Sequence, residues 1–339
     1  EEPEGGEERE VGLLLEAREV ALTEEANAAD LAVEEVRGCR CATEIMPCEP
    51  GTSSGKSATG AMRKDATDGA ALLPCIGCGL LPLRKHVIPE SRVPEMLASS
   101  EAAGDRGSKL RETLRASDLV SGGYEGGFKL WECTIDLLQE LWHGHLDNTL
   151  SIRGTTVLEA GCGAGLPAML SLRLGCRLAV LHDFNAEVIQ SLTMPAFRLN
   201  GFSGDQHARF YSGDWARLNE LLLSERKQEA ACHGDGQNSE NQTREPLPED
   251  GFDIILSSET IYDTQSTPRL WALIQSQLRY PTGVALVAAK SYYFGVGGSV
   301  AAFKTLVEAE GRFTCSTTRV IEDGASNRRE VLAIRWRPR

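Results

Sequence analysis

Short apolar segments alternate with helical patterns along the second half of the chain. The apolar segments lie at 155–160, 178–181, 208–212, 252–256 and 284–290. Between them apolar residues recur at the three- and four-residue spacing of a helix with one buried face, for example over 267–278. Strands that alternate with helices are typical of a parallel sheet covered by helices on both faces. The pattern therefore predicts an α/β fold with five β–α units.

The end of the chain departs from this alternation. Two extended segments, 313–321 and 330–336, are joined by the turn sequence Glu322-Asp323-Gly324 with no helix between them. Together with the five β–α units they predict a Rossmann-like sheet of seven strands that ends in an antiparallel hairpin. This is the arrangement of the seven-stranded methyltransferase sheet, and an ordinary dinucleotide-binding domain would not end in this way.

The first apolar segment runs into a glycine-rich turn. Glu159 stands just ahead of Gly161, Gly163 and Gly165, and a helix-forming run follows at 168–174. Alternate glycines let the backbone approach a ligand, and the free N–H groups of a helix start bind polar groups. The spacing is not the G-x-G-x-x-G of a dinucleotide site, and the Glu159 carboxylate would repel a pyrophosphate. It suits a cationic ligand with an amino-acid end, S-adenosylmethionine, and a plain turn of another α/β protein is the alternative.

Three further strand ends carry polar or aromatic residues. Asp183 follows the second strand, Asp214 and Trp215 follow the third, and a segment that contains Glu259 follows the fourth. Ligands of open α/β sheets bind at the carboxyl ends of the strands. We therefore expect Asp183 to hold ribose hydroxyls and the pair after the third strand to contact the adenine.

Composition and charge narrow the partners. The chain has 339 residues, 41% of them hydrophobic and 25% charged, which is ordinary for a globular protein. No apolar run approaches the roughly 20 residues that span a bilayer, so we expect no membrane partner. A net charge of −14 argues against broad binding of nucleic acid and favours a basic protein partner.

The acidity is concentrated near the start of the chain. Residues 1–50 contain 15 Asp and Glu against four Arg and no Lys. We predict an acidic, disordered tail over 1–70 with a transient helix at 10–37, and a transitional helical segment over 71–119 with a helix at 108–119. The methyltransferase domain is predicted over 120–339, with the polar stretch 224–249 as a flexible insertion.

Ten cysteines raise the alternative of a metal site. Cys75 and Cys78 form one C-x-x-C pair, and Cys39, Cys41 and Cys48 lie upstream. Zinc sites usually contain two such pairs at regular separation, so we expect no metal. We expect the cysteines to be free thiols in a reducing compartment.

Three segments carry a resemblance to a known family. They are Tyr124-Glu125-Gly126-Gly127-Phe128-Lys129-Leu130-Trp131-Glu132-Cys133-Thr134, Ser258-Glu259-Thr260-Ile261-Tyr262 and Ala289-Lys290-Ser291-Tyr292-Tyr293-Phe294-Gly295-Val296-Gly297-Gly298. With them the chain resembles, over 118–337, the protein-histidine N-methyltransferases that modify a large-subunit ribosomal protein. The resemblance implies S-adenosylmethionine as cofactor, a ribosomal protein as partner, and a cytoplasmic and nuclear or nucleolar location. Residues 1–70 and 224–249 have no recognised counterpart.

The resemblance also implies a set of cofactor contacts. They are Leu130, Trp131, Glu132, Cys133, Thr134, Gly161, His182, Asp183, Phe184, Gly213, Asp214, Trp215 and Ser258. The residue pattern itself adds Glu159, Gly163 and Gly165.

Methyl transfer to imidazole requires alignment and a neutral nucleophile, which imidazole already is at pH 7 because its pKa is about 6.5. A carboxylate bonded to one ring N–H fixes the tautomer and directs the other nitrogen. We predict that Glu259 does this, with Tyr262 or Tyr292 walling the pocket.

Three alternatives stay open at this point. Glu259 and Tyr262 also fit the acid-x-x-aromatic pattern of lysine methyltransferases, whose acceptor must lose a proton from a pKa of about 10.4. A non-catalytic adaptor could bind the cofactor and act as a chaperone for a basic ribosomal protein through the acidic tail. RNA methylation is disfavoured by the acidity and by the absence of an Asn-Pro-Pro-Tyr-type motif after the fourth strand.

Overall fold

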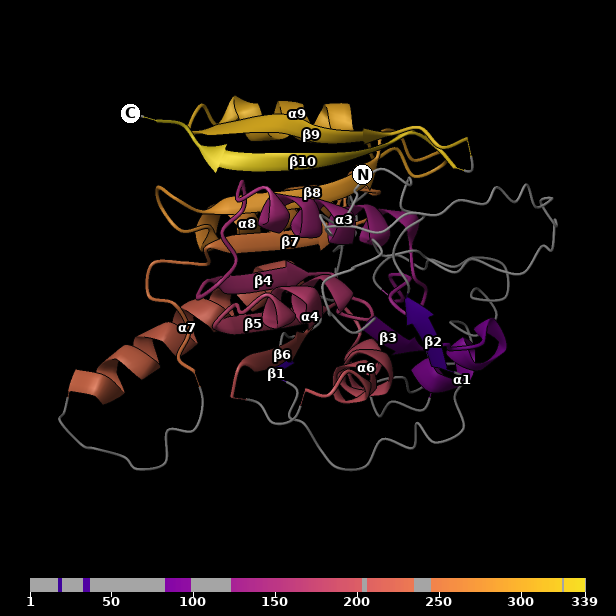
Figure 1. Ribbon diagram of the computed structural model, residues 1–339, viewed down its shortest axis with the longest axis horizontal. Coiled ribbons are helices and arrows are strands. Elements are labelled where there is room, and N and C mark those ends of the chain that lie inside the picture. Colours follow the sequence, from indigo (N-terminus) through magenta and orange to yellow (C-terminus); the bar gives the residue numbers. More distant parts are fainter. Residues whose placement is uncertain are drawn as a thin grey trace, which may run out of the picture.

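The computed structural model describes residues 18–19, 33–36, 83–98, 123–202, 206–234, 245–324 and 326–338. Figure 1 shows a central sheet with helices on both of its faces. The five central strands are parallel: β4 (Thr156–Ala160), β5 (Leu178–Asp183), β6 (Ala208–Ser212), β7 (Ile254–Ser258) and β8 (Val284–Lys290). Each lies within two residues of its predicted position.

The terminal hairpin gives the sheet its mixed character. β9 (Phe313–Ile321) and β10 (Arg329–Trp336) are antiparallel, and β10 inserts between β8 and β9 (Figure 1). The sheet order is β1-β6-β5-β4-β7-β8-β10-β9, in which the two-residue strand β1 (Arg18–Glu19) extends the β6 edge. The predicted seven-stranded methyltransferase sheet with its antiparallel hairpin is confirmed.

Helices bury both faces of the sheet, and successive side chains of a strand point to opposite faces. Val157 of β4 packs with one set of helices and its neighbour Leu158 with the other. The first set is α3 (Glu132–Leu146), α4 (Leu166–Arg173), the short α5 (Ala186–Val188) with the π-helical turn Ile189–Thr193, and α6 (Met194–Leu199). The second is α7 (Trp215–Gly234), α8 (Thr267–Gln277) and α9 (Val300–Ala309). Strands that are buried at every position, such as β4 and β5, follow from this double coverage.

Helix α7 corrects one prediction. Residues 224–234 belong to this helix and are not part of a flexible insertion. Glu225 and Glu229, one helical turn apart, face β6: Glu229 Oε1 lies 2.6 Å from Arg209 Nη2, and the Tyr211 hydroxyl donates to Glu225 Oε2 at 2.6 Å. The sequence did not indicate this part of the helix because its inward-facing side chains are charged. They pair with the buried Arg209 instead of packing with apolar residues. Residues 235–244 lie outside the described part of the chain.

The N-terminal predictions are tested only in part. The described residues within 10–37 are extended and not helical: they form β1 and β2 (Val33–Val36), and β2 pairs with β3 (Leu83–His86). A 3₁₀ turn (Glu90–Arg92) and α1 (Val93–Ala98) follow. The Arg84 N–H donates to Asn200 Oδ1 at 2.8 Å, which attaches β3 to the end of α6. The helix predicted at 108–119 and the cysteines from Cys39 to Cys78 lie outside the described residues.

Candidate active site

A cavity of about 700 Å³ lies at the carboxyl ends of β4, β5, β6 and β7. Its volume falls within the range of about 300–1,000 Å³ that is typical of small-molecule sites. The predicted site residues that line it are Leu130, Trp131, Thr134, Gly161, Gly163, Asp183, Phe184, Asp214, Trp215, Ser258, Glu259 and Tyr262. Segments far apart in the sequence thus meet at the sheet edge where the strand pattern predicted a ligand.

The glycine loop forms one end of the cavity from backbone. Gly161, Gly163 and Gly165 all have positive φ, between 50° and 71°. A Cβ atom on Gly163 would lie 3.0 Å from the carbonyl oxygen of Gly127, so the segment before α3 closes directly over the loop. The close approach explains why glycine is required here.

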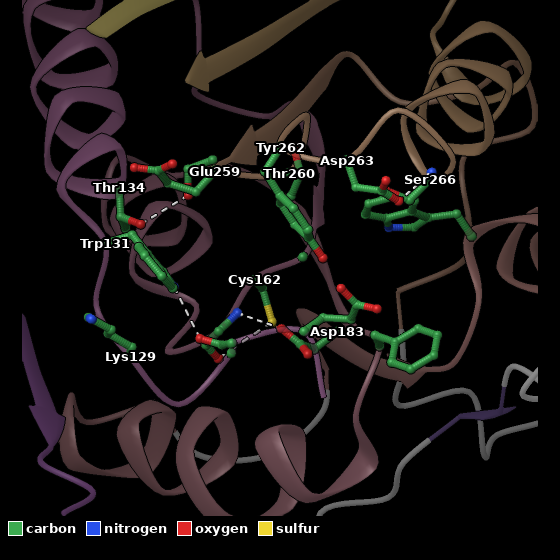
Figure 2. A pocket seen from close by; sticks show the side chains of 18 of the residues that line it. Lys129, Trp131, Thr134, Cys162, Asp183, Glu259, Thr260, Tyr262, Asp263 and Ser266 are labelled. Atoms are coloured by element: carbon green, nitrogen blue, oxygen red, sulfur yellow. Dashed lines mark hydrogen bonds between the residues drawn. The ribbon is translucent and has the colours of Figure 1, made fainter. Parts of the chain in front are cut away.

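Asp183 is held against this loop. Its Oδ2 accepts the Gly163 N–H at 2.9 Å, and its Oδ1 accepts the Asn185 N–H at 3.3 Å. Burial raises the pKa of Asp183 to about 6, although the backbone donors oppose the shift. The carboxylate lines the cavity beside Cys162, as Figure 2 shows, in a place suited to a hydroxyl donor.

Two residues of the glycine motif face away from the cavity. Glu159 is 1% exposed, and its Oε2 accepts the Ala168 N–H at 2.8 Å, in the first turn of α4. Burial raises its pKa to about 8. A Cβ on Gly165 would meet Leu181 Cδ2 at 2.6 Å. The structure therefore gives Glu159 a helix-start contact and Gly165 a packing role, where the sequence predicted cofactor contacts.

Four other predicted contacts also lie outside the cavity lining. His182 is buried, with Nε2 2.9 Å from the Gly213 carbonyl oxygen, and burial lowers its pKa to about 4. Cys133 is in the core, where burial, and then the neighbouring Glu259 carboxylate, raise the pKa of its thiol. Glu132 is directed to Lys290, with Oε2 3.3 Å from Nζ. Gly213 is the fourth of these residues.

The opposite end of the cavity is built around Glu259. This residue is 8% exposed and has φ 57°, a conformation that costs free energy for any residue except glycine. Its Oε2 accepts the Tyr293 hydroxyl proton at 2.7 Å. Its Oε1 lies 3.5 Å from Lys290 Nζ and is buried without a hydrogen bond to any described residue. Figure 2 places Glu259 beside Thr134 and Trp131, at the end of the cavity near α3.

Of the two tyrosines predicted to wall the pocket, Tyr262 lines the cavity and Tyr292 does not. Tyr292 is 49% exposed, contacts the Phe294 ring edge-on at 5.0 Å and is not among the lining residues. Tyr293, buried, is the residue that reaches Glu259. The contact with Glu259 was therefore not predicted for Tyr293, the neighbour of the predicted Tyr292.

Trp131 covers the Glu259 end of the cavity. Its indole N–H donates to the Gly126 carbonyl at 3.1 Å, and the ammonium groups of Lys129 and Lys290 lie 4.8 Å and 5.4 Å from the ring centroid. Just beyond it the hydroxyls of Thr134 and Ser258 are 3.0 Å apart, which joins the start of α3 to the end of β7 (Figure 2).

Several lining residues were missed by sequence reasoning. They are Glu125, Gly126, Gly127, Lys129, Cys162, Ala164, Ala216, Thr260, Asp263, Gln265, Ser266 and Arg269. The Gly126-Gly127 pair and the polar start of α8 were available signals of loops at the sheet edge. Arg269 closes the side of the cavity near Asp214 by an ion pair, with Nη1 2.9 Å from Oδ2 of that residue.

The part of the chain that the structure describes holds no group of three His, Cys, Asp or Glu side chains placed to bind a metal. None of its helices combines the length and the apolar character needed to cross a membrane.

Comparison with known proteins identifies the family. No protein-family model matches the chain. A histidine protein methyltransferase 1 homolog of Rattus norvegicus is 31% identical over 288 residues, which cover 72% of this chain and 72% of the rat protein. The chain belongs to the histidine protein methyltransferase 1 family. The prediction of the family is thereby confirmed.

Other members of the histidine protein methyltransferase 1 family differ in coverage. The Dictyostelium discoideum homolog is 39% identical over 222 residues, 65% of this chain and 61% of its own length. The Schizosaccharomyces pombe protein is 32% identical over 59% of this chain and 62% of its own length. The chain thus matches less than two thirds of these two relatives.

Solved structures give a more distant likeness. Magnesium protoporphyrin IX methyltransferase from Synechocystis PCC 6803, with bound SAH, is 11% identical at a TM-score of 0.41, over 71% of this chain and 92% of that one. Ribosomal protein L11 methylase from Lactobacillus delbrueckii subsp. bulgaricus is 16% identical at a TM-score of 0.37, over 60% and 80%. At these scores the likeness carries no argument for function.

Proposed function

We propose that the protein transfers a methyl group from S-adenosylmethionine to a histidine imidazole of a protein. The observation that carries the proposal is one continuous cavity that joins the Gly163–Asp183 end to the Glu259 end, in a chain of the histidine protein methyltransferase 1 family. The first end is suited to a nucleoside, and the second presents a carboxylate to an acceptor.

The residues of the cavity fit the cofactor. Asp183 offers a carboxylate for ribose hydroxyls, and the glycine loop leaves room for close contact. Trp215 Nε1 and Ser266 Oγ are buried without a hydrogen-bond partner among the described residues, so both have bonding capacity left for a ligand. When bound, S-adenosylmethionine supplies a methyl group on a sulfonium, which the acceptor nitrogen displaces in line. Aligning the acceptor is then the task of the chain itself.

Glu259 is the group that would align an imidazole. Its Oε2 is occupied by Tyr293, and its Oε1 has an unused lone pair. A ring N–H bonded to Oε1 would leave the other ring nitrogen with its lone pair free for the methyl group. Tyr262, which also lines the cavity and contacts Tyr293 edge-on at 6.4 Å, would flank the ring.

Lysine as acceptor fits this end less well. A lysine must lose a proton before it reacts, and Glu259 would have to receive it. Glu259 already faces the ammonium of Lys290, and although burial opposes the charge, Glu259 and Glu132 raise the pKa of Lys290. A second ammonium would be repelled there, whereas a neutral imidazole is not.

The pH profile of kcat/KM separates the two acceptors. With histidine, the acceptor-dependent kcat/KM should level off by about pH 7.5–8, because the imidazole pKa is about 6.5. A value that still rises tenfold per pH unit above pH 8.5, with a stable enzyme, would replace histidine by lysine.

We further propose a basic large-subunit ribosomal protein as substrate, and a cytoplasmic and nuclear or nucleolar location. The support is the net charge of −14, which favours a basic partner, and the resemblance described above. The experiment is incubation of acid-extracted large-subunit ribosomal proteins with enzyme and deuterated-methyl cofactor, followed by mass spectrometry of the peptides. Methyl label on one histidine supports the proposal. Cofactor binding without transfer to any protein would favour the adaptor alternative.

A further inference from the structure

Tyr293 follows β8, and hydrogen bonds fix both its backbone and its hydroxyl group. Its N–H donates to the Gly298 carbonyl at 3.0 Å, and its carbonyl accepts the Gly297 N–H at 3.2 Å. The Gly298 backbone in turn donates to the Tyr262 carbonyl at 2.9 Å, and a Cβ on Gly298 would collide with Ile261 and Tyr262. The Tyr293 ring therefore has a fixed position relative to the segment that carries Glu259.

The hydroxyl group of Tyr293 has only one possible arrangement. Its oxygen accepts the backbone N–H of Lys290 at 3.1 Å, because a backbone N–H can only donate. Its single proton is then left for Glu259 Oε2, at 2.7 Å. The bond thus fixes one oxygen of the carboxylate and identifies the other, Oε1, as the unused acceptor.

The groups around Oε1 explain why such a clamp is needed. Lys290 Nζ stands 3.5 Å from Glu259 Oε1 and 3.3 Å from Glu132 Oε2, so one ammonium is shared by two carboxylates. The Cys133 thiol, kept protonated by burial, is only a weak donor. Without the Tyr293 hydroxyl, the carboxylate could rotate and bond fully to Lys290, which would use up its acceptor capacity.

We propose that Tyr293 is a positioning residue for methyl transfer, which holds Glu259 so that Oε1 receives the ring N–H of the acceptor imidazole. This inference rests on the proposed function. As the acceptor nitrogen forms its bond to the methyl carbon, the S–C bond breaks and its electron pair stays on sulfur. The resulting imidazolium gives its N–H proton to Glu259 Oε1 and from there to water, and the carboxylate is restored.

The test compares Tyr293→Phe with Tyr292→Phe. The first variant removes the hydroxyl that bonds Glu259 and keeps the ring, and the second removes the same group from the half-exposed neighbour outside the cavity. Tyr293→Phe should lower kcat by about 10- to 100-fold with the KM for the ribosomal protein mixture changed less than about threefold. Tyr292→Phe should stay within about twofold of the wild type. Calorimetric affinity for S-adenosylmethionine should be unchanged in both.

A double-mutant cycle excludes a merely structural effect. In a Glu259→Gln background, Tyr293→Phe should cause no further loss of kcat, since its partner is already altered. Additive losses, a wild-type kcat in Tyr293→Phe, or an unaffected Glu259→Gln enzyme would each overturn the inference. The rate is followed as acceptor-dependent formation of S-adenosylhomocysteine. A lysine product would therefore refute the proposed function and leave the Tyr293–Glu259 coupling measurable.

Discussion

The two ends of the cavity are built by different means. The Gly163 end is made of backbone with one carboxylate, Asp183, that two N–H groups hold in place. The Glu259 end is made of side-chain charges that β7, β8 and α3 bring together, with Lys290 between Glu132 and Glu259. A backbone site tolerates few changes of shape, whereas a charge site depends on the position and protonation of single groups. We expect the first to control cofactor affinity and the second to control turnover.

Gly163→Val should give the largest effect, because a branched side chain would collide with the Gly127 carbonyl. We expect affinity for S-adenosylmethionine to fall by more than about 100-fold, equivalent to about 2.7 kcal/mol. Calorimetry measures it. Gly154→Val is the matched control, since Gly154 also has positive φ but no atom near its Cβ position. If both variants bind the cofactor equally well, the loop does not define that end of the cavity.

Glu259→Gln tests the other end. The amide cannot accept the imidazolium proton, so kcat should fall by about 100-fold, while the cofactor dissociation constant should change less than about threefold. Steady-state rates and calorimetry on the same preparation measure both quantities. A weakened cofactor affinity with normal kcat would reverse the division of tasks between the two ends.

Asp183→Ala should weaken cofactor binding by about 1.5–3 kcal/mol, the value of a hydrogen bond to a charged group. Because the pKa of Asp183 is raised to about 6, the wild-type affinity should also decrease below that pH as the carboxylate becomes protonated. Calorimetric titrations at pH 5.5 and 7.5 check both expectations. An affinity that Asp183→Ala leaves unchanged would remove this residue from the ribose site.

Glu159→Gln should have the smallest effect on binding, less than about threefold, because this carboxylate faces α4. Glu159 should instead affect how the stability of the protein depends on pH. The folded pKa of about 8 is above the ordinary carboxyl value of 4.5, so the folded protein binds this proton more tightly. The contribution of Glu159 to stability is complete below about pH 4.5 and is lost as the pH rises through 8.

The melting temperature of the wild type should therefore drop relative to Glu159→Gln between pH 5 and pH 8. Thermal unfolding of the two proteins at both pH values measures the difference. A constant difference, or a large loss of cofactor affinity in Glu159→Gln, would return this residue to the cofactor site.

The sequence predicted the backbone end of the cavity better than the charge end, for a physical reason. Gly161 and Gly163 are close together in the sequence and indicate a loop whose backbone other atoms can approach closely. Asp183 follows a strand whose end is easy to locate. The partnership of Glu259, Lys290 and Tyr293 arises only when β7 and β8 pair, so its members cannot be ranked in advance. The burial of Tyr293 and the exposure of its neighbour Tyr292 likewise arise only in the folded chain.

The same limit explains the error in 224–234. In the sequence, Glu225 and Glu229 are typical of a polar loop. Only the folded structure shows that both pair with Arg209 of β6. Strands β4, β5, β7 and β8, in contrast, were predictable because burial on both faces leaves mainly apolar runs, and the terminal turn at Gly324 marks the hairpin.

Helix α7 has a practical consequence for labelling the protein. It begins at Trp215 on the cavity wall, and its 20 residues extend about 30 Å at 1.5 Å per residue. Its last turns meet Arg209 near the start of β6, and the chain re-enters there, where the Glu245 N–H donates to the Gln206 carbonyl. A fluorescent domain or an affinity tag inserted at 235–244 would thus be attached at the sheet edge remote from the ligand. It would stand at the amino end of β6, whereas the cavity lies at the carboxyl ends of the strands.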